Sequence, residues 1–307
     1  MRYVLFWSFA LLLAARSPER LMLREGRSLQ SSAQVSESGG AICTAGFQPR
    51  NWYHARIPST VLNALVTAKL YPDPYFGMNL RSIPGTSYPI GQSFSNLPMP
   101  DDSPFKSSWW FRTEFRVPAA YSGKTVWLHF KGINYRANLW LNGRRLASSR
   151  EMAGAWRLFE YNVSDAVRPG QINCLALEIF PPQPNDLAIT LVDWNPMPPD
   201  KLMGIWRDVW LTTSGPVAIR FPYVVSRLNP PANDCAEITV GAELRNASHQ
   251  PVEGTLKGRI GKIEFTQPVR LAAGQTSVVK LLPTKFPQLR IQNPRLWWPV
   301  QVRPQNR

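Results

Sequence analysis

The chain has 307 residues, a formal net charge of +15 and a pI of about 10.2. At roughly 100 to 200 residues per domain, this length fits two domains. Its lysines and arginines are scattered singly, with no run of five and no basic helix, which argues against a nucleic-acid partner and predicts an arginine-rich, solvated surface. Twelve Trp, 29 Pro and 19 Gly favour many short strands and turns over long helices.

The N-terminus has the pattern of an export signal. Arg2 precedes an apolar run over residues 4–15, and small residues suited to cleavage follow. The run is shorter than the about 20 residues of a membrane-spanning helix. We therefore predict a signal peptide at residues 1–17, no membrane span, and export to the periplasm or the extracellular space. The polar residues 18–40 predict a linker.

The chain shows no sequence motif for a metal or a cofactor. It has no phosphate loop and no GxSxG, and its cysteines form no CxxC, so they fit buried thiols or at most one disulfide. The histidines are isolated and predict strand or loop residues, not ligands or bases. These residues are Cys43, Cys174, Cys235, His54, His129 and His249.

The first predicted domain, residues 41–214, is an antiparallel β-sandwich of the jelly-roll type. Residues 41–55 hold a first strand, 57–69 a short helix and 71–106 a long irregular segment. Regular turn signals and alternating apolar residues then predict strands, including a hairpin closed by Asn142-Gly143. The strands are expected at residues 109–117, 125–132, 137–146, 157–163, 172–180 and 205–213.

The second predicted domain, residues 215–300, is an immunoglobulin-like β-sandwich. It follows the boundary Ser214-Gly215-Pro216 and contains short strands at residues 218–225, 236–246, 254–264 and 277–282. One inward row of apolar residues runs from Ile238 to Leu244, as this fold requires. Residues 301–307 remain as a tail.

The stretch from Leu191 to Leu211 joins a rigid loop to an apolar strand. Four Asn and Pro residues that disfavour regular secondary structure stiffen the loop around Asp193 and Trp194. A two-residue alternation predicts a strand from Ile205 onward. A carboxylate and an indole at the rim of a sheet are groups that can together bind a polar ring. The alternative is a buried tryptophan in an ordinary proline-rich connection.

The abundance of tryptophan favours a protein that binds sugars, because indoles stack on pyranose rings while carboxylates take the hydroxyls. Core packing is the alternative for each indole. A glycoside hydrolase also needs two carboxyl groups about 5 to 10 Å apart, and the sequence identifies no such pair. The candidates are Trp109, Trp110, Trp140, Trp156, Trp194, Asp73, Asp101, Asp102, Asp193 and Asp200.

Five segments, in this order, resemble the non-catalytic N-terminal half of glycoside hydrolase family 2, in its exo-β-D-glucosaminidase and β-mannosidase branch. The segments FKGINYRANLWLNG and DWNPMPPDKLMGIWRDVWL are the specific ones. The five lie at residues 72–79, 107–115, 130–143, 193–211 and 293–299.

The resemblance implies a galactose-binding-like jelly roll, an immunoglobulin-like domain and then a (β/α)8 barrel with the catalytic Glu pair. It also implies that Asp193 and Trp194 help to recognise a terminal sugar of a β-linked oligosaccharide. After Pro299 the sequence has only VQVRPQNR, too short for a barrel of about 250 residues. No catalytic residue is therefore predicted here, and a separately encoded barrel would be a partner. The alternatives are a stand-alone carbohydrate-binding module and an adhesin-like spacer.

Overall fold

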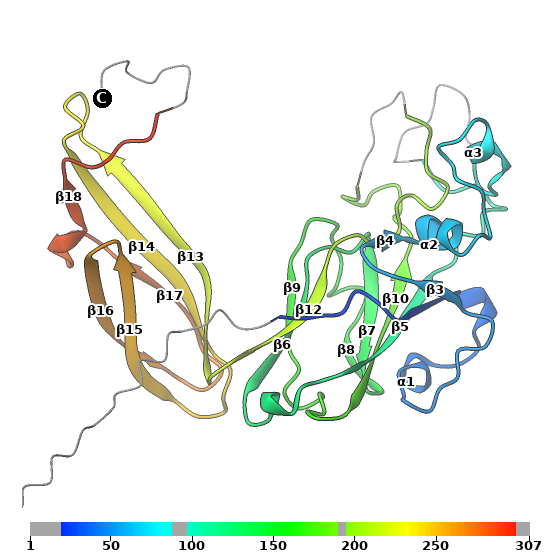
Figure 1. Ribbon diagram of the computed structural model, residues 1–307, viewed down its shortest axis with the longest axis horizontal. Coiled ribbons are helices and arrows are strands. Elements are labelled where there is room, and N and C mark those ends of the chain that lie inside the picture. Colours follow the sequence, from blue (N-terminus) through cyan, green and yellow to red (C-terminus); the bar gives the residue numbers. More distant parts are fainter. Residues whose placement is uncertain (1–19, 88–96, 190–194, 299–307) are drawn as a thin grey trace, which may run out of the picture. The chain divides into compact units, whose positions relative to one another are not determined.

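The computed structural model describes residues 20–87, 97–189 and 195–298 (Figure 1). The chain forms two compact units, Met1–Thr213 and Ser214–Arg307, here called unit 1 and unit 2. The predicted signal peptide, the tail and the candidates Asp193 and Trp194 lie outside the described residues.

Unit 1 is built on two antiparallel sheets. The four-stranded sheet has the order β1 (Leu21–Met22), β12 (Val209–Ser214), β6 (Thr125–Phe130), β9 (Phe159–Asn162). The six-stranded sheet has the order β3 (Tyr53–Ala55), β2 (Arg27–Ser31), β5 (Trp109–Arg116), β10 (Ile172–Phe180), β7 (Arg136–Leu141), β8 (Arg144–Ala147). The all-β sandwich predicted from alternation is confirmed.

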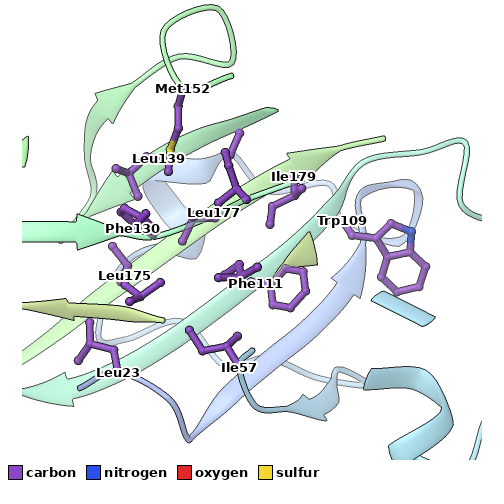
Figure 2. Close-up of a cluster of buried hydrophobic side chains, with 14 of the residues drawn as sticks. Leu23, Ile57, Trp109, Phe111, Phe130, Leu139, Met152, Leu175, Leu177 and Ile179 are labelled. Carbon is purple, nitrogen blue, oxygen red and sulfur yellow. The ribbon is translucent and has the colours of Figure 1, made fainter. Parts of the chain in front are cut away.

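The main core of unit 1 lies between these sheets. Alternation in β5 and β10 turns Phe111, Leu175 and Leu177 inward, where they meet Phe130 of β6 and Leu139 of β7 (Figure 2). All five side chains are buried, and full burial of one such side chain stabilises a fold by about 1.5 to 3 kcal/mol. The core therefore fixes the register of both sheets.

The β7–β8 hairpin turns at Asn142-Gly143, as the sequence predicts. Both residues have positive φ, 51° and 86°, and Leu141 pairs directly with Arg144. A two-residue turn with two positive φ angles matches the twist of the strands, and Asn-Gly adopts it most easily.

The prediction of a polar linker over residues 18–40 is wrong. Strands β1 and β2 lie in this segment, and β2 pairs with both β3 and β5. The inward residues of β2 are Arg27, Leu29 and Ser31, all buried. Because two of these three inward residues are polar, the sequence of β2 shows no alternation of apolar and polar residues.

The short elements β4 (Ser59–Thr60), α2 (Val61–Thr67) and α3 (Asn79–Ser82) lie toward one end of unit 1 (Figure 1). Helix α2 confirms the helix predicted in residues 57–69, and β4 precedes it. The strand predicted to run through residues 205–213 is interrupted, because β11 (Gly204–Ile205) pairs with β4 whereas β12 joins the four-stranded sheet. The remaining short elements are η1 (Ser32–Gln34), α1 (Gly39–Ile42) and η2 (Ala119–Tyr121).

Unit 2 is also all-β. One sheet contains β13 (Val217–Leu228), β14 (Cys235–Asn246) and β17 (Thr276–Leu281), with β18 (Arg290–Gln292) on β14, and η3 (Pro287–Leu289) precedes β18. The second pairs β15 (Val252–Ile260) with β16 (Ile263–Leu271). The single strand predicted at residues 254–264 is therefore wrong, because Gly261, with φ of 59°, turns the chain there.

The inward row predicted on β14 is present, since Ile238 and Leu244 lie in the core of unit 2, Val240 packs against that core and Ala242 is buried. Across the described residues of the whole chain, no helix is both long and apolar enough to cross a membrane.

Candidate functional site

A pocket of about 880 Å³ opens at the end of unit 1 that carries α2 and β4. Its walls come from two neighbouring segments, residues 58–66 and 73–80, and from a third that is distant in sequence, residues 195–206. Two of these segments overlap the motifs at residues 72–79 and 193–211. Its polar lining residues are Ser59, Thr60, Asn63, Asp73, Asn195 and Asp200.

Asp200 anchors the third wall to the N-terminus of α2. Its Oδ2 accepts a hydrogen bond from the amide of Leu62 at 2.8 Å, and its Oδ1 accepts one from the amide of Leu202 at 3.0 Å. Thr60 caps the same helix end by accepting from the amide of Asn63 at 3.1 Å. Burial raises the pKa of Asp200 to about 6, although the bonds from Leu62 and Leu202 oppose this shift. The carboxyl group therefore has a structural role.

Asn134 holds the turn that follows Asp200. It is fully buried, and its Nδ2 donates to the carbonyls of Lys201 and Leu202, both at 3.0 Å. Lys201 and Leu202 have φ of 48° and 57°, a left-handed conformation that costs side chains free energy. The Asn134 amide thus stabilises a strained turn that positions the pocket wall.

Gly204 is required by the close approach of two strands. A Cβ atom at this position would lie 2.4 Å from the carbonyl oxygen of Ser59 and 2.7 Å from Cα of Thr60. The backbone of Gly204 also exchanges two hydrogen bonds of 2.9 Å with Asn134. These contacts hold the pocket wall that contains Gly204 against Asn134 and against β4, the strand that precedes α2.

Trp206 contributes an aromatic wall. Its Nε1 donates to the carbonyl of Ala155 at 3.0 Å, and its ring meets Trp156 edge to face with centroids 4.7 Å apart. The Arg207 guanidinium lies 4.4 Å from the Trp206 ring, a cation–π distance. Trp206 is therefore fixed on several sides.

The rim of the pocket carries exposed aromatic surface. Tyr75 lines the pocket and is 97% exposed, and the neighbouring Phe76 is 75% exposed. Asp73 holds this segment, because its Oδ1 accepts a hydrogen bond from the amide of Tyr75 at 3.0 Å. Exposed aromatic groups beside a polar pocket are typical of an interaction surface.

The structure separates the tryptophan candidates. Trp109 and Trp110 are buried, and Trp140 packs on Trp110 at 5.2 Å between ring centroids, so these three have packing roles. Trp156 is 64% exposed and contacts the pocket wall through Trp206. Trp194 lies outside the described residues.

The carboxylate candidates separate as well. Asp73 and Asp200 line the pocket, whereas Asp101 forms a surface ion pair with Lys106 and Asp102 is exposed. Asp193 lies outside the described residues. Because Asp200 is fully engaged, the described lining of this pocket offers no acid–base pair for glycoside hydrolysis.

His129 is a strand residue of β6, as the sequence predicts, and does not line this pocket. His129 contacts Glu160 at 3.1 Å and Thr212 at 2.8 Å, and stacks on Trp210. Among described residues, no group of three His, Cys, Asp or Glu side chains could hold a metal ion. Asn134 was not among the candidates of the sequence analysis, and its only signal was its position in the motif at residues 130–143.

Two family models match the chain. The glycosyl hydrolase 2 galactose-binding domain-like model matches residues 102–191, and the glycosyl hydrolases family 2 model matches residues 217–306. The exo-β-D-glucosaminidase of Streptomyces avermitilis is 36% identical over 276 residues, which cover 90% of this chain and 28% of that protein. The chain carries N-terminal domains of glycoside hydrolase family 2. The resemblance found in the sequence is thereby confirmed.

Further family 2 relatives agree. The exo-β-D-glucosaminidase of Amycolatopsis orientalis is 32% identical over 283 residues, covering 92% of this chain and 25% of that protein. The crystal structure of the exo-chitosanase of the same organism matches with a TM-score of 0.75 and 31% identity, over 92% of this chain and 30% of that chain. The chain thus spans less than a third of the length of these family 2 relatives.

Proposed function

We propose that the chain supplies the sugar-binding and immunoglobulin-like domains of a family 2 β-glycosidase of the exo-β-D-glucosaminidase type. The observation that carries this proposal is the 36% identity to such an enzyme over 90% of the chain, together with a pocket on two of its family motifs. In this proposal, Asp193 and Trp194 contact the terminal sugar of a β-linked glucosamine oligosaccharide. The exposed rim at Tyr75 and Phe76 faces the rest of that site.

The chemistry of hydrolysis requires more than these residues. A retaining glycosidase uses two carboxyl groups about 5 to 5.5 Å apart, one as nucleophile and one as acid and base. Of the two carboxylates in the described lining of the pocket, Asp200 is buried and engaged, so that Asp73 has no second carboxylate as a partner among the described lining residues. A catalytic barrel needs about 250 residues, more than the 307 residues hold beside the two sandwiches. We therefore infer that these 307 residues alone hydrolyse no β-glycoside.

A chimera tests the proposal. Residues 20–298 replace the matching segment of the Amycolatopsis orientalis enzyme, and the release of p-nitrophenol from its β-D-glucosaminide is measured. The chimera is expected to hydrolyse the substrate, and Trp194→Ala in it to lower kcat/KM about tenfold, which equals about 1.4 kcal/mol.

The matched control is Trp297→Ala, which removes an 84% exposed indole from unit 2. It should leave kcat/KM of the chimera unchanged. Equal effects of the two substitutions would exclude Trp194 as a sugar contact. Turnover of an aryl β-glucosaminide or β-mannoside by the isolated 307 residues would exclude a need for further catalytic groups.

We also propose that the chain is exported, because Arg2 and the apolar run at residues 4–15 form an export signal. N-terminal sequencing of the protein recovered outside the cytoplasm tests this. The expected mature chain begins close to residue 18, and a chain recovered only inside the cell with Met1 intact contradicts export.

A further inference from the structure

A second apolar cluster covers the outer face of the six-stranded sheet of unit 1. Residues of β5 and β10 that alternate with the main core point into it, and the segment from Val35 to Trp52 closes over them. Its buried members are Ile42, Cys43, Trp110, Cys174 and Ala176. Two of these five are cysteines, and both are fully buried.

The sulfur atom of each cysteine lies close to a backbone carbonyl oxygen in the other cysteine's segment. The Cys43 thiol donates to the carbonyl oxygen of Cys174 at 3.0 Å, although the two residues are 131 positions apart in the sequence. The Cys174 sulfur lies 3.9 Å from the carbonyl oxygen of Ile42, the neighbour of Cys43. A disulfide requires Cα atoms about 4.4 to 6.8 Å apart with side chains directed at each other. Both cysteines are free thiols in this structure, and the reciprocal contacts place their side chains in one buried cluster, as a disulfide between the segment and the sheet requires.

In the folded chain, the surroundings of the two sulfurs favour the thiolate form of Cys43 over that of Cys174. A hydrogen bond from the Cys174 thiol, amides of the Asn142-Gly143 turn and the Arg112 charge lower the pKa of Cys43, although burial opposes this. The same pairing raises the pKa of Cys174. Arg112 also donates to the carbonyls of Ile42 and Thr44, on both sides of Cys43, at 2.9 and 2.8 Å. Thiolate character selects the cysteine that attacks a disulfide.

We propose that Cys43 and Cys174 form a disulfide bond when the chain folds with a disulfide oxidant, and that Cys235 remains a free thiol. The Cys43 thiolate attacks the oxidant and expels one thiolate, which gives a mixed disulfide. Cys174 then loses its proton and attacks the Cys43 sulfur, which expels the second thiolate. Two thiols are oxidised, one external disulfide is reduced, and the two protons pass to the departing thiolates. Because both sulfurs are fully buried in the folded chain, the first exchange takes place before the segment from Val35 to Trp52 closes, and the same balance holds if Cys174 attacks first.

Thiol counting by mass spectrometry tests the proposal on the whole chain. The protein is refolded with oxidised and reduced glutathione, denatured, and alkylated with iodoacetamide. Of its three cysteines, one should be alkylated before reduction and three after it. A proteolytic map should contain one linked peptide pair, joining Cys43 to Cys174.

The control is Cys235→Ser, which should leave no alkylated cysteine before reduction and the linked pair intact. Cys43→Ala should expose two thiols and abolish the difference in urea midpoint that reductant causes in the wild type. Three alkylated thiols in the folded, oxidised protein, or a linkage to Cys235, would overturn the proposal. If Cys43→Ala does not fold, the peptide map of the wild type decides by itself.

Discussion

The Asp200 carboxylate accepts a 2.8 Å hydrogen bond from the amide of Leu62, joining positions 138 residues apart. This bond places the loop before β11 on the N-terminus of α2, where the helix dipole favours negative charge. Two walls of the pocket are therefore held together by a buried acid. The pocket shape should depend on the charge of that acid.

The first prediction concerns pH. Burial raises the pKa of Asp200 to about 6 from an ordinary value of 3.8, a difference of about 2 units or about 3 kcal/mol. Because the folded pKa is the higher one, its contribution to stability is complete below pH 3.8 and is lost as pH rises through 6. Asp200→Asn cannot ionise at this position. The free energy of unfolding of this variant minus that of the wild type should therefore increase by about 3 kcal/mol between pH 4 and 7.

Urea denaturation followed by tryptophan fluorescence measures this difference at each pH. Asp102→Asn is the matched control, since it removes an exposed carboxylate. It should retain the wild-type pH dependence. A constant gap between Asp200→Asn and the wild type from pH 4 to 7 would show that the Asp200 pKa is ordinary.

Local signals in the sequence were sufficient for much of unit 1. The strands β5, β6, β7 and β10 follow from alternation, and the turn at Asn142-Gly143 follows from the Asn-Gly dipeptide, which the positive φ angles of both residues confirm. The strand β2 escaped because Arg27 and Ser31 occupy inward positions. Its place in the sheet depends on pairing with β5, which is 82 residues away from Arg27 at its first residue.

The candidate site was predictable only in part. The motifs containing Asp73 and Asp200 overlap two segments that line the pocket, but they did not indicate that Asp200 is a helix anchor. That role depends on Leu62, which lies in a different motif-free segment, so no local pattern reveals it. The hydrogen bonds from Asn134 to the carbonyls of Lys201 and Leu202 likewise join segments that are distant in the sequence. Long-range polar contacts of this kind leave no period in a sequence.

The second prediction concerns Gly204. In Gly204→Ala, the added Cβ would lie 2.4 Å from the carbonyl oxygen of Ser59, so β4 and β11 must separate. Overpacking of this kind should lower the free energy of unfolding by about 2 kcal/mol or more. Thermal and urea denaturation measure it. Gly46→Ala is the control, because no atom lies within 4 Å of its added Cβ, and an equal loss in both variants would contradict the argument.

The third prediction separates function from stability at the pocket rim. Tyr75 is 97% exposed, so Tyr75→Ala should change the free energy of unfolding by less than about 0.5 kcal/mol. In the active chimera, the same substitution should lower kcat/KM several-fold, because we propose that this exposed ring faces the completed site. Substitution of the exposed Trp297 serves again as the control. A Tyr75→Ala chimera with unchanged kcat/KM would show that the rim contacts neither sugar nor barrel.

The last prediction concerns Arg27, which is fully buried inside unit 1. Its Nη2 donates to the carbonyl of Leu23 at 2.8 Å, whereas its Nε and Nη1 have no hydrogen-bond partner among the described residues. Burial lowers the pKa of Arg27 to about 9, so its charge destabilises the fold near neutral pH. Arg27→Met keeps the apolar stem, removes the charge and loses one hydrogen bond, with an expected net gain of about 2 kcal/mol at pH 7.

The pH dependence gives this last prediction its sign. Because the folded pKa of this base is the lower one, the unfolded chain holds the proton more tightly, and wild-type stability should rise as pH passes 9. The advantage of Arg27→Met should therefore shrink between pH 8 and pH 10 in urea denaturation. Arg150→Met, at an exposed position, should leave the midpoint and its pH dependence unchanged. A destabilised Arg27→Met variant at pH 7 would mean that the guanidinium stabilises unit 1 through contacts stronger than its burial cost.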